Sequence, residues 1–319
     1  FYNRDSPTDG VWQSICTPSG SGNTALTTSS DTLVSGGGGG NMWRYVTCCY
    51  EPTQGKIVLL YIDDNESSKL YMLVGSTTGS AGSASITWGS SAVLIDGNNA
   101  ASGANGMDIC SCGNSRVLFS WSRNDNTTYV GAATITSGDS VTDISSSFGQ
   151  LATGNNAKVA WDRAADKGVT TYHSSSNTNQ AGKTRLITLG SSNALTLGSE
   201  LDSFNQQWEN ANLSYNAKLR QVVLFYKSGG GSGYTRGAIA NISGSTLTWT
   251  NDTQINNSID SYQGRCSSWN AADFGQSGSY GYVYIPTNNA GANRGMSYSS
   301  LVTTLSSSLK NYVQYVGFA

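Results

Sequence analysis

The chain of 319 residues is poor in charged groups and has no long apolar segment, and each absence removes a class of function. Charged residues make up 12% of the chain, against the roughly 25% of an average soluble domain. The formal net charge is −2 and no basic cluster is present, so we expect no nucleic-acid partner. No run approaches the roughly 18 apolar residues that a membrane helix requires, and we expect no membrane insertion.

Recognisable catalytic residues are equally scarce. The single histidine, His173, stands at the end of a strand-like segment, and no Gly-x-Ser-x-Gly motif supplies a serine nucleophile for it. A glycosidase needs two carboxylates that flank the scissile bond, but Asp63, Asp64 and Glu66 occupy a position where other repeats have polar turns. Acids elsewhere, among them Asp162, Asp166, Glu200, Asp202 and Asp273, are spread thinly along the chain. We interpret the acidic group as a solvated turn and expect that the chain is not an enzyme.

The six cysteines do not follow a metal-binding pattern. Four of them occupy equivalent places in two repeats, where other repeats carry small or apolar residues: Cys48, Cys49, Cys110 and Cys112. This is typical of buried filler. Because the usual zinc spacing is missing, we predict no metal and no other cofactor. Whether any cysteine, including Cys16 and Cys266, forms a disulfide stays open.

What the chain does contain is a short motif that occurs six times, in which a strand-like segment ends in a large side chain. The six anchors are Tyr50, Cys112, Trp161, Tyr215, Trp269 and Phe318. They lie roughly 50–60 residues apart, and periods of this size are typical of repeat architectures. The glycine run over residues 36–40 precedes the first full repeat, and we interpret it as a flexible connector.

The repeat over residues 46–95 contains four strand-like segments rich in β-branched and aromatic residues. They are Val46–Tyr50, Lys56–Tyr61, Leu70–Val74 and Ile86–Ile95. Turn-forming Gly, Pro, Asn and Asp residues bound them, and the other repeats keep the same order. Four antiparallel strands in each repeat predict a β-propeller, because a single blade cannot bury its own faces without neighbours on both sides.

The two ends of the chain predict how the ring closes. The last anchor, Phe318, is followed by one residue only, whereas the N-terminal region supplies strand-like segments that lack a first strand. These segments are Val11–Cys16, Thr24–Thr28 and Thr32–Val34. We predict a single all-β domain over residues 1–319, a six-bladed β-propeller of four-stranded antiparallel blades. Residues 1–45 complete the last blade beside the C-terminal strand, which removes two exposed sheet edges. Five blades plus terminal strands are the alternative.

Aromatic residues near strand ends and in loops are the candidate ligand contacts. A sugar ring stacks on an aromatic face and hydrogen-bonds to neighbouring Asn, Gln and Ser side chains. The candidate ligand-binding residues are Trp43, Tyr45, Tyr129, Trp208, Tyr234 and Tyr262. We interpret Arg185, Arg236 and Arg294, which recur near the start of third strands, as part of the repeat and not as a ligand clamp.

The repeat resembles those of tail-fibre-like proteins of marine bacteriophages, notably phages of cyanobacteria. The likeness lies in Tyr50-Glu51-Pro52, Lys56–Tyr61, Ser85–Ser90 and the terminal Tyr315–Ala319. In that family, further sequence normally follows the terminal motif. The resemblance carries no catalytic motif.

The resemblance implies a virion or extracellular location and a tail-fibre or adhesin domain that recognises a host-surface polysaccharide or glycan. It also implies contacts with other virion proteins and assembly into a homo-oligomer. A structural virion decoration or an extracellular filament subunit is the alternative. A glycan-degrading propeller enzyme is the second alternative.

Overall fold

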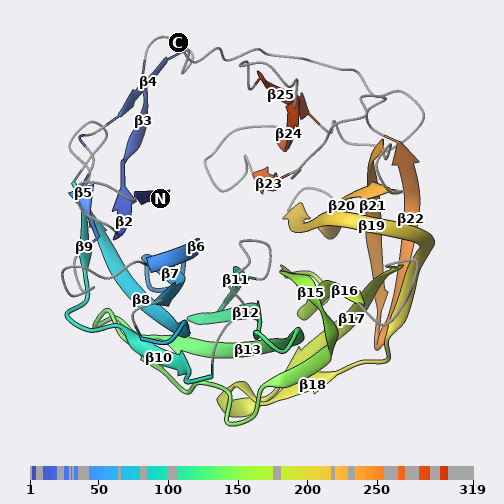
Figure 1. The fold of residues 1–319 in the computed structure, drawn as a ribbon, viewed down its shortest axis with the longest axis horizontal. Helices are drawn as coiled ribbons and strands as arrows, with labels where there is room; N and C mark the ends of the chain where they lie inside the picture. Colours follow the sequence, from blue (N-terminus) through green and yellow to red (C-terminus); the bar gives the residue numbers. More distant parts are fainter. Residues whose placement is uncertain are drawn as a thin grey trace.

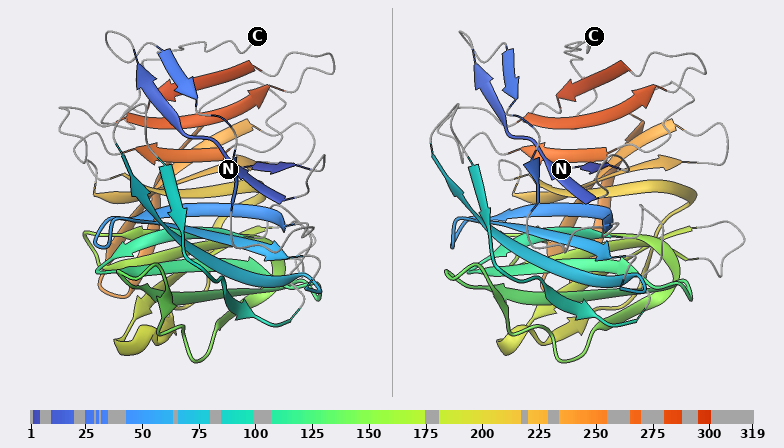
Figure 2. Two further views of the ribbon diagram at one scale, coloured as in Figure 1. Left: turned by 90° about the vertical axis from the view of Figure 1, so that its left-hand side faces the viewer. Right: turned by 60° about the vertical axis from the view of Figure 1, so that its left-hand side comes forward.

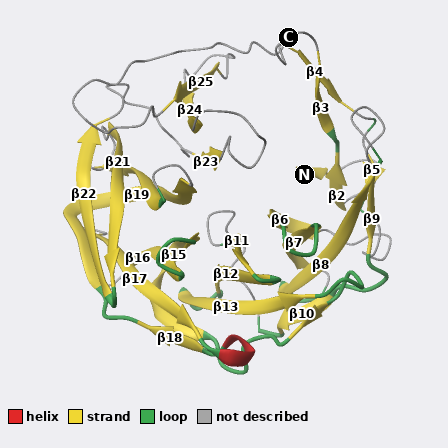
Figure 3. Ribbon diagram, turned by 180° about the vertical axis from the view of Figure 1, so that it is seen from behind, coloured by secondary structure: helices red, strands yellow, loops and turns green. Residues whose placement is uncertain are grey.

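The fold consists almost entirely of β-strands arranged around an axis (Figure 1). The computed structural model describes residues 2–4, 10–19, 25–28, 30, 32–34, 43–63, 66–79, 85–98, 107–174, 181–216, 220–228, 234–254, 265–269, 280–287 and 295–300. Within these residues the single helical element is a short 3-10 turn, Ser191–Asn193 (red in Figure 3), and no helix there could cross a membrane. The predicted all-β class is confirmed.

The first complete blade matches the predicted four segments, with a fourth strand that is split into two pieces. It consists of β6 (Trp43–Glu51), β7 (Lys56–Asp63), β8 (Lys69–Thr78), β9 (Ser85–Trp88) and β10 (Val93–Asp96). Both β9 and β10 pair antiparallel with β8, β9 near its end and β10 near its start. The two pieces therefore act as one outer strand with a bend between them.

Two long strands link the next blades, because each serves as the outer strand of one blade and the inner strand of the following one. The elements are β11 (Asp108–Gly113), β12 (Arg116–Ser122), β13 (Thr127–Ile135), β14 (Val141–Thr142), β15 (Gly149–Asp162), β16 (Lys167–Ser174), β17 (Ala181–Leu189), β18 (Leu195–Leu197), β19 (Leu201–Asn216), β20 (Gln221–Ser228), β21 (Tyr234–Ser243) and β22 (Thr246–Gln254). The first part of β15 pairs with β13 and its second part with β16. In the same way β19 passes from β17 to β20.

A three-stranded sheet follows β22 around the ring. It consists of β23 (Arg265–Trp269), β24 (Tyr280–Thr287) and β25 (Gly295–Ser300), which pair in sequence order. In side view the N-terminal strands β3 and β4 (dark blue) lie at the same end of the molecule as β24 and β25 (red) (Figure 2).

The N-terminal strands pair as the third and fourth strands of the other blades do. They are β1 (Tyr2–Arg4), β2 (Gly10–Gln13), β3 (Cys16–Ser19), β4 (Ala25–Thr28) and β5 (Thr32–Leu33). Here β3 pairs with β4 and β2 pairs with β5, as β8 pairs with β9 and β10. The predicted third strand is thus interrupted between β2 and β3, and β1 adds a strand beside β2 that the sequence did not predict. The glycine run and the anchor Phe318 lie outside the described residues.

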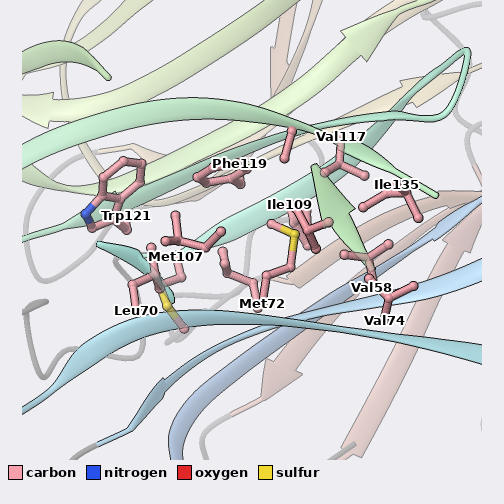
Figure 4. Packing of buried hydrophobic residues seen from close by; sticks show 14 of the residues in the cluster. Val58, Leu70, Met72, Val74, Met107, Ile109, Val117, Phe119, Trp121 and Ile135 are labelled. Atoms are coloured by element: carbon pink, nitrogen blue, oxygen red, sulfur yellow. The ribbon is translucent and has the colours of Figure 1, made fainter. Parts of the chain in front are cut away.

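The hydrophobic core lies between neighbouring blades, as the repeat predicts. One cluster joins Val58 and Met72 of the first blade to Ile109, Val117 and Phe119 of the second, and each of these side chains is buried (Figure 4). A second contact holds the N-terminal strands to the first blade, where Trp88 Nε1 donates to Gln13 Oε1 at 3.0 Å. Because each blade buries both faces against its neighbours, adjacent blades stabilise one another.

One glycine permits a particularly close approach within this core. A Cβ atom at Gly131 would lie 2.6 Å from Cζ of the fully buried Phe119 ring. The ring therefore occupies the space that any larger residue on β13 would need.

Candidate functional site

The second strand of each described four-stranded blade ends at the same edge of the ring, where the third strand begins. We call this edge the hairpin rim. Each second strand places a nearly fully buried aromatic residue there: Tyr61, Trp121, Tyr172 and Tyr226. Because all the blades share one strand order, side chains at equivalent positions gather at one face of the molecule.

The clearest polar group at this rim is the Arg236 cluster, formed by Tyr226, Arg236 and Asp252. Tyr226 of β20 lies directly across from Arg236 of β21, and Asp252 is on β22. The Arg236 Nε and Nη2 atoms donate to Asp252 Oδ1 and Oδ2 at 2.8 and 3.0 Å, and Tyr226 donates its hydroxyl to Oδ1 at 2.8 Å. The hydrogen bond to Asp252 raises the pKa of Arg236. The guanidinium remains 22% exposed and the carboxylate 20%.

The Arg185 cluster occupies the same place in the preceding blade and comprises Tyr172, Lys183, Arg185, Glu200 and Asp202. Tyr172 donates its hydroxyl to Glu200 Oε2 and accepts from Arg185 Nε at 3.1 Å. The guanidinium also lies 3.4 Å from Glu200, while Lys183 forms ion pairs with both Glu200 and Asp202. Burial raises the pKa of Glu200, but hydrogen bonds from Tyr172 and Lys183 outweigh it and leave the pKa lowered. Glu200 is therefore an ionised acceptor at neutral pH.

The Arg123 cluster is built from similar groups but joins two blades. Asp96 of the first blade accepts hydrogen bonds from Trp121 Nε1 and Arg123 Nε, both at 2.8 Å. The same carboxylate accepts two further bonds from Asn98, through its backbone and side-chain nitrogens. Arg123 also donates to the Tyr129 hydroxyl, and its guanidinium lies 4.1 Å above the Tyr129 ring. The Asp96 side chain is only 3% exposed, and its four acceptor positions are occupied.

The first blade carries a different arrangement at this rim. Tyr61 and Tyr71 stack with ring centroids 5.8 Å apart, and burial raises the pKa of Tyr61. The nearby cation, Lys69, pairs with Glu66 at 3.2 Å. Asp63 is buried at the end of β7, so the prediction of a solvated acidic turn is wrong for this residue, whereas Glu66 is exposed as expected. Asp64 lies outside the described residues.

The aromatic residues predicted to bind ligand lie at several places on the strands. Tyr129 belongs to the Arg123 cluster. The backbone pairing aligns Trp208 of β19 with Ser228 and Ser228 with Tyr234 of β21, which places both aromatic positions at the hairpin rim of the Arg236 blade. Trp43 and Tyr45 are on β6, where the structure describes the backbone and not these side chains, and Tyr262 lies outside the described residues.

The role of the arginines was missed in the sequence. Arg185 and Arg236 hold carboxylates at the rim and are not merely features of the repeat, while Arg294 lies outside the described residues. A signal was present, because each arginine follows a threonine and meets an acid at a similar separation. Glu200 lies 15 residues after Arg185, and Asp252 lies 16 residues after Arg236.

One further carboxylate, that of Asp108, lies on an inner strand and belongs to none of the rim clusters. Asp108 is the first residue of β11, and its Oδ2 accepts from the backbone nitrogen of Val159 in the next blade at 3.0 Å. Lys158 donates to the carbonyl oxygen of Met107 at 3.1 Å. Burial raises the pKa of Asp108, and the neighbouring Lys158 and backbone amides only partly oppose this effect. Asp108 is therefore a carboxyl group that holds its proton more strongly than an ordinary aspartate.

Other candidate residues have structural surroundings. Asp162 caps the turn after β15 by accepting from the backbone nitrogens of Ala164 and Ala165 at 2.9 Å, as Glu51 does after β6. His173 lies within β16. Cys112 is buried, but Cys48 is exposed, so the prediction of buried filler is wrong for Cys48. Among the described residues, no group of three or more His, Cys, Asp or Glu side chains is arranged to hold a metal ion.

No protein-family model and no curated protein matches the chain. Among solved structures, AofleA from Arthrobotrys oligospora is similar with a TM-score of 0.51 and 11% identity over 92% of this chain and 77% of that one. An N-acetylgalactosamine deacetylase from F. plautii, in complex with blood group B trisaccharide, has a TM-score of 0.39 and 10% identity. The match covers 88% of this chain and 87% of that one. An exo-beta-1,3-galactanase from Phanerochaete chrysosporium has a TM-score of 0.38 and 11% identity, and the match covers 90% of this chain and 60% of that one. The observed strand order and the likeness to AofleA define the chain as an all-β protein of the β-propeller type.

The fold corrects one expectation from the sequence. The absence of a recognisable catalytic motif led us to expect that the chain is not an enzyme. This expectation is wrong as an inference from the repeat, because a propeller fold and a missing motif do not by themselves exclude an enzyme. A fold of this kind does not separate binding proteins from enzymes, because function resides in the site that a fold carries.

Proposed function

We propose that this protein is a glycan-active propeller that binds saccharides at the hairpin rim and degrades them. The observation that carries the binding part is the recurrence of an aromatic, a guanidinium and a carboxylate in the Arg185 and Arg236 clusters. In both clusters the arginine and its carboxylate partner are partly exposed, and the clusters lie at equivalent places in neighbouring blades. The chain's uncharged polar surface, with 12% charged residues, also suits a hydroxyl-rich ligand.

The chemistry of each cluster matches that of a sugar. A guanidinium offers several N–H donors in a fixed plane, and an ionised carboxylate accepts up to about four hydrogen bonds. The buried tyrosine fixes the carboxylate in place, so that its orientation is set before a ligand arrives. Two adjacent blades with such clusters allow a long glycan to engage both, which raises the overall affinity without new kinds of contact.

The binding proposal predicts that Arg236→Gln weakens saccharide binding by about tenfold or more, which corresponds to about 1.4 kcal/mol. Glutamine loses the paired donors to Asp252 and the remaining guanidinium N–H groups. Glycan-array screening followed by calorimetry with the best oligosaccharide measures the change. Arg163→Gln is the matched control, because Arg163 is exposed in the turn after β15, at the opposite edge of the ring. Equal affinity for Arg236→Gln and the control would contradict the proposal.

Degradation is assigned to the inner strands and not to the rim. A glycosidase needs one carboxyl group that stays protonated to donate to the leaving oxygen, and such groups have raised pKa values. Burial shifts the pKa of Asp108 in this direction, whereas the pKa of Glu200 in the Arg185 cluster is lowered. We therefore assign Asp108 as the candidate general acid.

This assignment predicts that Asp108→Asn lowers the rate of oligosaccharide cleavage by about tenfold or more, because general acid catalysis is lost. Asparagine keeps an oxygen that can accept from Val159, so the blades stay joined. Release of reducing ends from a panel of oligosaccharides gives the rate. Asp162→Asn is the control, since Asp162 only caps a turn. Unchanged cleavage by Asp108→Asn would refute the assignment of Asp108 as the general acid, and no cleavage by the native protein would refute degradation itself. Either outcome leaves the binding proposal standing.

The finer features of the architecture and setting remain predictions. The pairing of β2 to β5 supports a sixth blade that the two chain ends complete, with five blades plus terminal strands as the alternative. The tail-fibre role, the virion or extracellular location, the partner virion proteins and the homo-oligomer rest on the sequence resemblance alone. Immunoelectron microscopy of virus particles tests the location directly.

A further inference from the structure

The rim clusters differ in whether their hydrogen-bonding groups are already occupied, and this difference limits what they can bind. In the Arg236 cluster, Asp252 Oδ1 accepts from Tyr226 and Arg236, whereas Oδ2 accepts only from Arg236 among the described residues. The described hydrogen bonds of Arg236 use Nε and Nη2 and leave Nη1 as a donor. The cluster therefore contains one guanidinium nitrogen and one carboxylate oxygen that can form a further hydrogen bond.

The Arg185 cluster has the same pair of groups. Arg185 uses Nε and Nη2 in its described bonds, which leaves Nη1. Glu200 Oε2 accepts from Tyr172 and Arg185, while Oε1 has only the 3.4 Å ion pair with Lys183. The Glu200 side chain is 33% exposed, so a ligand can reach this oxygen.

The Arg123 cluster does not offer such a pair. Both oxygens of Asp96 accept two hydrogen bonds each, and the carboxylate is buried beneath Trp121 and Arg123. Its groups resemble those of the other two clusters, but they join the first blade to the second. It acts as a structural contact between blades.

Positive and negative charges balance within the Arg185 cluster and within the Arg236 cluster. Arg236 is compensated by Asp252, and the cations Lys183 and Arg185 are compensated by Glu200 and Asp202. An anionic group that approached either guanidinium would also meet the carboxylate that is already bound to it, and the two negative charges would repel. A sugar hydroxyl both donates and accepts, so two neighbouring hydroxyls can use the guanidinium N–H and the free carboxylate oxygen together.

We propose that the Arg185 and Arg236 clusters are two sites selective for neutral saccharides with adjacent hydroxyls, and that the Arg123 cluster is not a binding site. This inference rests on the proposed function and specifies its ligand class and its sites. It follows that binding depends little on ionic strength, because no net charge is neutralised when the ligand binds.

The first experiment compares neutral and acidic oligosaccharides of equal length. Calorimetry with mannotetraose, galactotetraose and tetragalacturonate is carried out at about 20 mM and about 500 mM NaCl, between which screening changes strongly. We expect a neutral tetrasaccharide to bind with a Kd that changes by less than about twofold, and tetragalacturonate to bind about tenfold more weakly or worse. Preference for tetragalacturonate would overturn the inference and leave the proposed function intact. Absence of binding to every saccharide would overturn both.

Variants test the charge balance and the assignment of sites. Asp252→Asn removes the charge that compensates Arg236, so we expect affinity for tetragalacturonate to rise by about tenfold while affinity for the neutral ligand falls. Asp125→Asn, at an exposed carboxylate in the turn after β12, is the control. Arg123→Gln should keep neutral-saccharide binding in protein that remains folded by circular dichroism. The inference would be contradicted if Asp252→Asn kept the native ratio of affinities for the neutral and acidic saccharides. It would also be contradicted if folded Arg123→Gln no longer bound the neutral saccharide.

Discussion

Replacement of Trp121 by alanine is expected to lower the free energy of unfolding by about 3–5 kcal/mol, as for other fully buried large aromatic residues. The indole is completely buried between the first two blades. It stacks on Tyr129 with centroids 5.5 Å apart, meets Phe148 edge-on at 4.7 Å and contacts Phe119 at 5.6 Å. The substitution would leave a cavity in the largest inter-blade cluster and deprive Asp96 of one donor.

Chemical denaturation followed by far-ultraviolet circular dichroism measures this loss. Trp121→Phe should cost less than alanine, because the ring still fills most of the space and only the Nε1 donor disappears. Trp249→Ala provides a matched control, since Trp249 lies on the outer strand β22 and is only partly buried. If Trp121→Ala were no more destabilising than Trp249→Ala, packing between the first two blades would not limit stability.

Replacement of Asp96 by alanine is the second large effect, expected at about 3 kcal/mol because it breaks a buried ion pair and leaves buried donors unpaired. Trp121 Nε1 is buried and would lose the acceptor that lies 2.8 Å away. Arg123, at 21% exposure, keeps Tyr129 and partial access to water, which moderates the cost. Asp96→Asn should cost less, since its amide oxygen can still accept from the indole. Equal losses for alanine and asparagine would show that the charge, and not the acceptor, matters.

The same carboxylate predicts a pH dependence of stability. Burial raises the pKa of Asp96, but hydrogen bonds from Arg123, Asn98 and Trp121 outweigh it, and the pKa is lowered overall. A lowered folded-state pKa means that the ionised form contributes stability above the unfolded value of about 3.9, and that this contribution is lost as the pH falls through the folded value. The stability difference between the native protein and Asp96→Asn should therefore shrink below about pH 4. A difference that stays constant down to acid unfolding would contradict this assignment.

Much of the strand order could be predicted from the sequence, because the repeat shows itself in short-range patterns. Segments such as Lys56–Tyr61 alternate with turn residues, and the structure places β7 over Lys56–Asp63. The sharing of β15 and β19 between blades could not be predicted in the same way. A strand that changes partners halfway has no distinct local pattern, and only the pairing shows it.

The polar clusters at the hairpin rim could likewise be predicted only in part from the sequence. The sequence contains Arg185 and Arg236 at equivalent places, yet it does not say which acid each arginine meets, because several carboxylates lie within reach along the chain. Asp96 illustrates the difficulty, since it follows the outer strand of one blade and bonds to side chains of the next. The aromatic residues that the sequence favoured as ligand contacts were chosen by their type and by their expected position near strand ends and in loops. The structure instead shows arginine–carboxylate pairs at the hairpin rim, which the choice of aromatic residues did not include.

The sequence by itself determined the all-β class, the repeat and the places of most strands, because alternation of apolar residues and turn chemistry act over a few positions. The tertiary structure decided which groups are open to a ligand. Asp252 and Asp96 both bond to an arginine and an aromatic residue. The Asp252 side chain is 20% exposed and its Oδ2 bonds only to Arg236 among the described residues, whereas Asp96 is buried and both of its oxygens are fully paired. That distinction depends on how neighbouring blades pack, and packing joins residues that the sequence separates.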